Sequence, residues 1–285
     1  MVSVKELRSI ELSSYTIIAT AIAVLFSIIS SIIMTIAIGI TSPNALGVSI
    51  YLISTLVVGT LMYTTYNTFC QGFLYNTLGK KLNIIQIAFK DEKEIIKISP
   101  ATTAIIVSMI LTIQMILLYL ASVFIFPLLI NAVIQTLMLS GQQILAYGLY
   151  QFMLVLSQPI VIAMIIFGTF IISFVFILLG CYIYNILANS GRGIIVNLSK
   201  ENGYTAIDSV NVKRFSIVFG IIGGILSLLS LVISMGGSGN ITALIINIII
   251  GFIVAFASGA LTAIFYNFLA PKLGKLKLEL IDLTN

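Results

Sequence analysis

Neutral polar side chains inside long apolar stretches are the residues of this 285-residue chain that are best placed to bind a ligand or to take part in chemistry. Thr64, Asn67, Thr68 and Gln71 recur at intervals of three to four residues, a spacing that places them on one face of a helix. Such a face either packs against a neighbouring helix through hydrogen bonds or lines a polar pocket for a ligand. Both interpretations fit the residue types.

Two further polar residues are more isolated. Gln114 lies near the middle of one apolar stretch and Asn247 lies in another, and each predicts either an interhelical hydrogen bond or the lining of a path or lipid pocket. The chain has no histidine, which is the commonest general base and metal ligand. No ionisable residue lies in the core of an apolar stretch, where proton relays and ion-coupled pumps carry them. We therefore expect no catalytic residue, no metal and no cofactor.

Three Tyr-Asn pairs, each at the end of an apolar stretch and each followed by glycine, form a second set of candidates. Tyrosine favours the level of the lipid headgroups, asparagine caps helix ends, and glycine adopts positive φ readily. We expect structural turns here. Their residues are Tyr75, Asn76, Gly79, Tyr184, Asn185, Gly191, Gly193, Tyr266, Asn267 and Gly274.

The elements that position these residues follow from the composition, which is 60% hydrophobic and only 8% charged. Globular domains carry roughly 25% charged residues, and a spanning helix needs about 20 apolar residues in a row. We therefore predict an α-helical polytopic membrane protein with six transmembrane helices. The qualifying stretches are 14–40, 49–75, 101–126, 159–185, 214–235 and 241–268.

The distribution of charge predicts the orientation. All 14 Lys and Arg lie at 5–8, 80–97, 192–214 and 272–277, whereas the alternate connections carry no charge. Basic segments stay inside the cell, so we expect a multi-pass protein of the cell membrane with both termini cytoplasmic and its cations facing anionic inner-leaflet lipids. The cations are too few and too scattered for a nucleic-acid surface.

Short strand-like segments flank each pair of spans. The triplets Ile10-Glu11-Leu12, Ile96-Lys97-Ile98 and Val210-Asn211-Val212 precede the odd-numbered spans, and alternating segments at 82–87, 194–198 and 276–280 follow the Tyr-Asn pairs. This order predicts three tandem strand-helix-helix-strand repeats, at 1–89, 90–199 and 200–285. Hairpins across 82–98 and 194–212, closed by pairing of the C-terminal strand with residues 8–12, would form a small cytoplasmic β-sheet or barrel.

The second repeat carries an additional outer segment, 127–158, bounded by Pro127 and Pro159. A seventh span there would move the later positive charges outside, against the usual bias. We therefore expect an uncharged amphipathic helix at the outer membrane surface, broken near Gly141.

Three features of the second repeat carry a resemblance to a known family. They are the start Ile98-Ser99-Pro100, the ending Tyr184-Asn185-Ile186-Leu187, and the turn and strand that run from Gly191 to Leu198. They resemble a prokaryotic, actinobacterial-type two-span transmembrane family of unknown function, which ends in Leu-Tyr-Asn-Leu, Gly-Gly and Val-x-Val-x-Leu. The other repeats depart from the pattern, since each lacks the proline and keeps one glycine, Gly79 or Gly274. The resemblance covers about a third of the chain and implies a membrane protein of the cell envelope or its division apparatus, with no known catalytic residues.

Two functions fit these features. The first is a non-enzymatic integral membrane scaffold or accessory subunit that docks a membrane or cytoplasmic protein partner. The second is a channel or facilitator for an uncharged solute or lipid, which a continuous polar cavity would favour.

Overall fold

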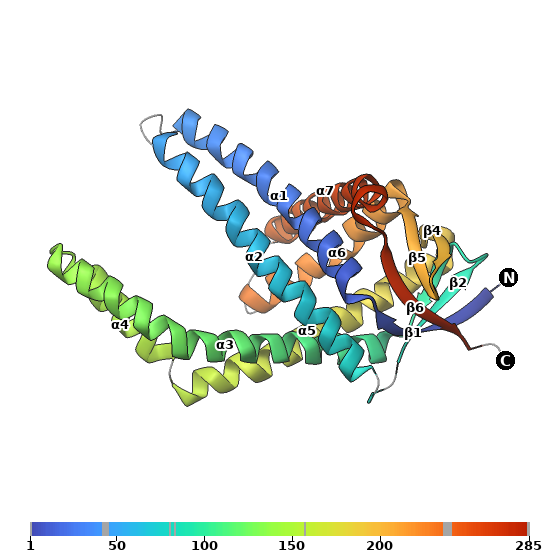
Figure 1. The fold of residues 1–285 in the computed structure, drawn as a ribbon, viewed down its shortest axis with the longest axis horizontal. Coiled ribbons are helices and arrows are strands. Elements are labelled where there is room, and N and C mark those ends of the chain that lie inside the picture. Colours follow the sequence, from blue (N-terminus) through green and yellow to red (C-terminus); the bar gives the residue numbers. More distant parts are fainter. Residues whose placement is uncertain are drawn as a thin grey trace. The chain divides into compact units, whose positions relative to one another are not determined.

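The computed structural model describes residues 2–41, 46–79, 81–82, 84–156, 158–235 and 241–283. The predicted outer turns at 42–45 and 236–240 and the basic residue Lys80 lie outside the described residues. The elements, shown in Figure 1, are β1 (Val2–Ile10), α1 (Leu12–Thr41), α2 (Leu46–Leu78), β2 (Ile85–Lys90), β3 (Glu94–Ile98), α3 (Pro100–Leu139), α4 (Gln143–Leu156), α5 (Pro159–Leu187), β4 (Ile194–Glu201), β5 (Tyr204–Val210), α6 (Val212–Met235), α7 (Ile241–Leu273) and β6 (Leu276–Asp282).

The chain divides into two compact units. The first, residues 1–103 and 178–285, contains every strand, the helices α1, α2, α6 and α7, and the strand-proximal ends of α3 and α5. The second, residues 104–177, contains the rest of α3 and α5 together with α4. The second unit has no Asp, Glu, Lys or Arg in its sequence.

The six strands form a closed barrel in the order β1-β2-β3-β4-β5-β6, with every neighbouring pair antiparallel. The predicted pairing of the C-terminal with the N-terminal strand is confirmed, since Leu7 lies opposite Leu280 and Ile10 opposite Leu278. Closure removes the exposed edges that would otherwise pair with other chains. The barrel is therefore complete within a single copy of the chain.

Several strand limits were predicted wrongly. β1 begins at Val2 rather than near residue 8, and β2 is Ile85–Lys90 rather than 82–87. β4 continues to Glu201 rather than ending at 198, and β5 is Tyr204–Val210, so it ends where the predicted triplet begins. Charged residues hid the alternation in β1, β2 and β4: Lys5 and Glu6 occupy the middle of β1, and Lys90 and Glu201 end the other two strands. The register matches an inward apolar face, because Leu7 pairs with Ile85 and both are buried.

Lys5 is a buried charge on this inward face, directly opposite Ile87. Its ammonium Nζ lies 3.2 Å from Oε1 of Glu92, in the turn between β2 and β3, and 3.5 Å from Oδ1 of Asp282, at the end of β6. A buried ammonium is tolerated only where carboxylates compensate for the lost water. These ion pairs join the two ends of the chain to the first hairpin.

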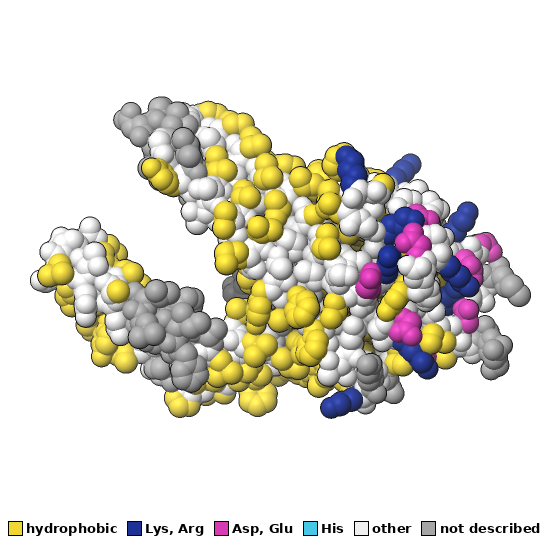
Figure 2. Space-filling view, in the orientation of Figure 1, with side chains coloured by type: hydrophobic (Ala, Val, Ile, Leu, Met, Phe, Trp, Pro, Cys, Tyr) yellow, Lys and Arg dark blue, Asp and Glu magenta, His cyan; other side chains and the backbone are white. Residues whose placement is uncertain are grey.

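Five helical segments of the described chain are long and apolar enough to cross a membrane: Leu12–Thr41, Pro100–Leu120, Pro159–Arg192, Val212–Ser230 and Ile241–Leu273. Large apolar side chains on them are exposed, as expected for lipid contact. Figure 2 shows the Lys, Arg, Asp and Glu side chains gathered over the barrel, while the helices present mainly apolar surface. These features identify a multi-pass membrane protein. α2 is 33 residues long but is not one of the five, and its second half contains the polar run that begins at Tyr63.

The predicted boundary at Pro127 is wrong. α3 continues through this proline as one helix of 40 residues, about 60 Å long at 1.5 Å per residue. Proline removes one backbone hydrogen bond, and apolar helices in membranes tolerate this loss without ending. The break comes instead at Gly141, whose φ is +78°, and α4 follows from Gln143. The expected break near Gly141 is thus confirmed.

α6 and α7 pack closely because small residues face one another along their length. A Cβ atom added at Gly223 would overlap Cβ of Ala255, and one added at Gly251 would overlap Ser227. Small residues at helix interfaces allow the backbones to approach closely. This helix pair therefore depends on glycine at these positions.

Candidate functional site

Each asparagine of the three Tyr-Asn pairs forms two hydrogen bonds to the backbone of one strand residue. Its side-chain oxygen accepts from the backbone N–H, and its side-chain NH2 donates to the carbonyl oxygen of the same residue. The pairs are Asn76 with Ile10, Asn185 with Ile98 and Asn267 with Val210, at 2.8 or 2.9 Å. We call these three contacts the asparagine clamps. Each clamp satisfies the last residue of a strand as a neighbouring strand would.

Each tyrosine of these pairs bridges two strands through its hydroxyl group, and for Tyr75 the second strand contact is the backbone of Ile85. The hydroxyl donates to a carbonyl three residues before the clamped residue; the acceptors are Leu7 for Tyr75, Ile95 for Tyr184 and Ile207 for Tyr266. The hydroxyls of Tyr184 and Tyr266 also accept from the N–H of the residue ten positions later, at 3.3 and 3.2 Å. Those two residues, Ile194 and Leu276, lie opposite the respective acceptors in the sheet. Each hydroxyl group therefore continues the hydrogen bonding between two strands onto the end of a helix.

A third hydrogen bond occurs three times, directly before α1, α3 and α6. The backbone N–H of the residue before each odd-numbered span donates to a carbonyl on the neighbouring strand. The pairs are Glu11 to Lys277, Ser99 to Gln86 and Asn211 to Ile195, at 3.0, 3.0 and 2.9 Å. The bonds place Ile98, and not Ile96, at the position equivalent to Ile10. The predicted alignment of the second triplet was therefore wrong by two residues, because its alternation lies inside β3.

Glycine is required after the Tyr-Asn pairs for two different reasons, positive φ at some positions and close approach of other atoms at others. Gly191 and Gly274 have φ of +76° and +107°, in the left-handed region as predicted. Gly193 donates its N–H to Oε1 of Glu94, and a Cβ atom there would lie 2.5 Å from the carbonyl oxygen of Ile95. Gly79 and Gly193 were expected to have positive φ and do not. A Cβ atom on Gly79 would lie 3.0 Å from the carbonyl oxygen of Tyr75, so close approach accounts for this glycine.

The polar face of α2 packs against α1. Gln71 accepts a hydrogen bond from the hydroxyl of Tyr15 at 2.9 Å. Thr68 is buried and donates to the carbonyl of Thr64 in its own helix, at 2.7 Å. Asn67 is half-buried on the same helix. These contacts favour packing over a ligand pocket for this set of residues.

The two isolated amides lie in different units. Asn247 donates to the carbonyl of Ser227 at 2.6 Å, and the Ser227 hydroxyl donates back to the carbonyl of Asn247 at 3.0 Å. This reciprocal pair joins α6 to α7. Gln114 is buried on α3 in the second unit.

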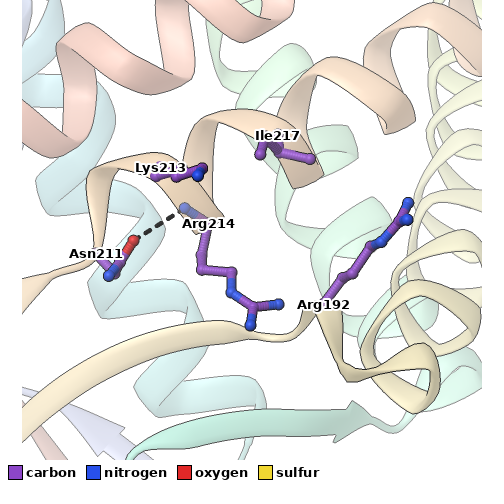
Figure 3. Close-up of a pocket in the computed structure, with 5 residues that line it drawn as sticks. All are labelled: Arg192, Asn211, Lys213, Arg214 and Ile217. Atoms are coloured by element: carbon purple, nitrogen blue, oxygen red, sulfur yellow. Dashed lines mark hydrogen bonds between the residues drawn. The ribbon is translucent and has the colours of Figure 1, made fainter.

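A basic cavity of about 550 Å³ lies where β4 and α6 begin. Its lining residues are Arg192, Asn211, Lys213, Arg214 and Ile217. Figure 3 shows Arg192 on one segment and the other four on or beside the first turns of α6. The side-chain oxygen of Asn211 accepts from the backbone N–H of Arg214 at 3.0 Å, which caps the helix. The Arg214 guanidinium donates to the carbonyl of Gly191, so one of the cations is held in place.

Sequence reasoning placed these cations near lipids but did not assemble them into a cavity. The hairpin of β4 and β5 brings Arg192 beside α6, although 21 residues separate Arg192 from Lys213. A second cavity, of about 390 Å³, is lined by Arg8, Ser9, Gly79, Leu82, Ile84 and Glu279. It contains a carboxylate, and the Ser9 hydroxyl donates to this carboxylate at 2.6 Å. Within the described part of the chain, no cluster of three Cys, Asp or Glu side chains forms a metal site.

A charged cluster on the barrel joins three strands. Nζ of Lys275 lies 2.6 Å from Oε1 of Glu201 and 2.8 Å from Oδ1 of Asp208. Hydrogen bonding from Lys275 holds the pKa of both carboxyl groups below their ordinary values, and Ser199 adds to the effect on Asp208. Reciprocally, Asp208 and then Glu201 raise the pKa of Lys275. The cluster thus stabilises the contact of β4 and β5 with the start of β6 at neutral pH.

No protein-family model, curated protein or solved structure matches the chain. The geometry of its own residues is therefore the basis for assigning a function.

Proposed function

We propose that the chain crosses the cell membrane six times as three tandem strand-helix-helix-strand repeats, with both termini and the barrel in the cytoplasm. Three sets of hydrogen bonds with constant spacing support the repeats. The clamped residue always follows the tyrosine's acceptor by three positions. α2 supplies the sixth span, since it pairs with α1 and its 33 residues reach about 50 Å. The same arrangement is what the resemblance of the second repeat to a two-span family implies.

Single cysteines test this topology in a background that lacks Cys70 and Cys181. Cysteine at Glu92 or Asn202, in the barrel hairpins, should react with an impermeant maleimide only after lysis. Cysteine at Asn44 or Asn240, in the outer turns beyond the described residues, should react in intact cells. Labelling at Glu92 in intact cells would refute the six-span orientation.

We propose further that the protein is a non-enzymatic membrane scaffold or accessory subunit that docks a protein partner. The observation that carries this proposal is the rigid connection between barrel and spans. Each of three helix ends contributes an asparagine clamp and a bridging tyrosine, so hydrogen bonds tie the barrel to the strand-proximal ends of α2, α5 and α7. A barrel fixed in this way, with charged residues on its outer face, is suited to hold a partner at a set height and angle.

The channel alternative receives less support from the same contacts. Its strongest candidate lining residues, Gln71 and Asn247, hydrogen-bond to neighbouring helices. Of the two cavities, the basic one lies at the strand-proximal ends of two spans, and the other lies beside β1 and β6. Solute flux in liposomes that contain the purified chain would overturn the scaffold proposal.

Two variants separate the candidate docking surfaces. Replacing residues 129–157 by a short Gly/Ser link removes the end of α3 and α4, the material found in only one repeat. Changing the exposed barrel cations Lys90 and Lys97 to glutamate alters the barrel alone. Quantitative co-purification in mild detergent should lose the native partner with one variant and keep it with the other. Retention of every partner by both correctly inserted variants would refute docking at either surface.

A further inference from the structure

The basic cavity collects three cations with no compensating acid. Arg192, Lys213 and Arg214 line it, and among the described residues none of the three forms an ion pair. Two other cations of the barrel, Lys5 and Lys275, each have two carboxylate partners. Three like charges around one space repel one another, so an anion that entered the cavity would relieve the repulsion.

The backbone around the cavity adds to the same preference. α6 begins at Val212, and the N-terminus of a helix favours negative charge. Arg214 is half-buried and is held by the carbonyl of Gly191, so its planar guanidinium is partly oriented before any ligand arrives. Arginine forks match the oxygens of phosphate groups well.

The position of the cavity favours an anion attached to a lipid. Arg192 ends one candidate span, Pro159–Arg192, and Arg214 lies in the first turn of another, Val212–Ser230. Ile217 supplies an apolar wall one turn further into α6. A phosphate at the cations would therefore lie at the membrane surface with hydrocarbon directly below it.

The corresponding residues of the other repeats lack this chemistry. The positions equivalent to Lys213 and Arg214, counted from the clamped residue, are Ser13-Ser14 in the first repeat and Ala101-Thr102 in the second. The position equivalent to Arg192, counted from the bridging tyrosine, is Gly274 in the third repeat. Only the junction between the second and third repeats therefore places these three cations together.

We propose that Arg192, Lys213 and Arg214 form a binding site for a phosphate group, and that the phosphate is the phosphodiester of an anionic phospholipid in the inner leaflet. Arg214 and Arg192 contact the phosphate oxygens, Lys213 adds charge at the mouth, and the acyl chains leave along Ile217. The assignment to the inner leaflet rests on the orientation given under the proposed function. The assignment of a phosphate ligand rests on the three cations alone and does not depend on that orientation.

Native mass spectrometry of the full chain in detergent tests the site with phosphatidylglycerol and phosphatidylcholine of identical acyl chains. We expect preferential retention of phosphatidylglycerol. The variant R192Q/K213Q/R214Q should lose this preference, with affinity falling about fivefold for each cation removed. The control K90Q/K93Q/K97Q removes the same charge from exposed barrel positions and should retain the preference. An equal loss in the control, or no loss in the cavity variant, would overturn the site.

Two further measurements cover a misfolded triple variant and a soluble phosphate ligand. The single change Arg192→Gln alters an exposed side chain, so it should weaken phosphatidylglycerol binding even if the triple variant fails to fold. A large excess of inorganic phosphate or glycerol phosphate should displace little lipid. Complete displacement would instead identify a site for soluble phosphate and overturn the lipid assignment. Because the measurement is made in detergent, it is independent of the labelling experiment, and the two proposals fail separately.

Discussion

The asparagine clamp at Asn185 is the most direct place to test how the barrel is attached to the helices. Asn185→Leu keeps the approximate size of the side chain and removes both hydrogen bonds to Ile98, each 2.9 Å long. The N–H and the carbonyl of Ile98 are then left without a partner at a half-buried position. No other element is changed directly.

The size of the effect follows from these two groups. Leaving a buried backbone donor or acceptor unsatisfied costs about 1–3 kcal/mol, and partial exposure brings the expected total to about 2–4 kcal/mol. At roughly 2–4 °C per kcal/mol for a chain of this order of size, the apparent Tm in detergent should fall by about 5–15 °C. The local opening of β3 should become easier by the same free energy.

Two measurements check this expectation. Thermal loss of the monodisperse size-exclusion peak gives the apparent Tm, and hydrogen exchange of the segment 94–100 reports on β3 itself. Asn189→Leu is the matched control, because Asn189 is exposed, lies four residues after Asn185, and its side chain forms no hydrogen bond among the described residues. This control should leave both the Tm and the exchange of β3 unchanged.

The two other asparagine clamps make the test stricter. Asn76→Leu and Asn267→Leu remove the same pair of bonds from Ile10 and Val210. Each should lower the Tm by a comparable amount and raise exchange in its own strand. If Asn185→Leu matched its control, or if the three variants affected only one strand, the clamps would not be what fixes the barrel.

Further predictions concern the helix pair and the charged cluster. Gly223→Ala should destabilise α6 against α7 by about 1–3 kcal/mol, and adding Ala255→Gly should restore much of the loss in apparent Tm, because the overlap is with Cβ of Ala255. Glu201 and Asp208 have pKa values below their ordinary 4.5 and 3.8. Their contribution is complete above those values and disappears as the pH falls through the lowered ones. Apparent Tm should therefore decline below about pH 4.5, and Lys275→Met should flatten that decline; an unchanged pH profile in the variant would contradict the role given to the cluster.

The barrel and its turns were predictable from sequence because they depend on short local patterns. The Tyr-Asn pairs and the alternating segments after them are visible without any fold, and the closing pair of β1 and β6 follows from the cost of free edges. The partner of each asparagine was not predictable. Nothing local to Asn185 indicates Ile98, because the two residues are 87 positions apart and meet only in the folded chain.

The errors have a common physical source. Strand limits were misplaced where charged residues such as Lys5 sit inside a barrel strand and are compensated by distant carboxylates. Pro127 was taken as a boundary, although an apolar helix can absorb a missing hydrogen bond. Gly79 was given a conformational role when its requirement is steric. In each case a rule for isolated segments was overridden by contacts that the sequence does not show.

The features that occur once in the chain, in contrast to those that occur three times, are the candidates for binding a specific ligand or partner. The clamps, the bridging tyrosines and the junction hydrogen bonds occur three times and serve the barrel. The long α3 with α4, and the cations at Arg192 and Arg214, occur once. In the proposed arrangement, both departures belong to the second repeat or to its junction with the third, one at each face of the membrane. If the proposed function is right, a scaffold of three equivalent parts needs such departures to bind one lipid and one partner in a single orientation, since an unbroken threefold arrangement would offer three equal ones.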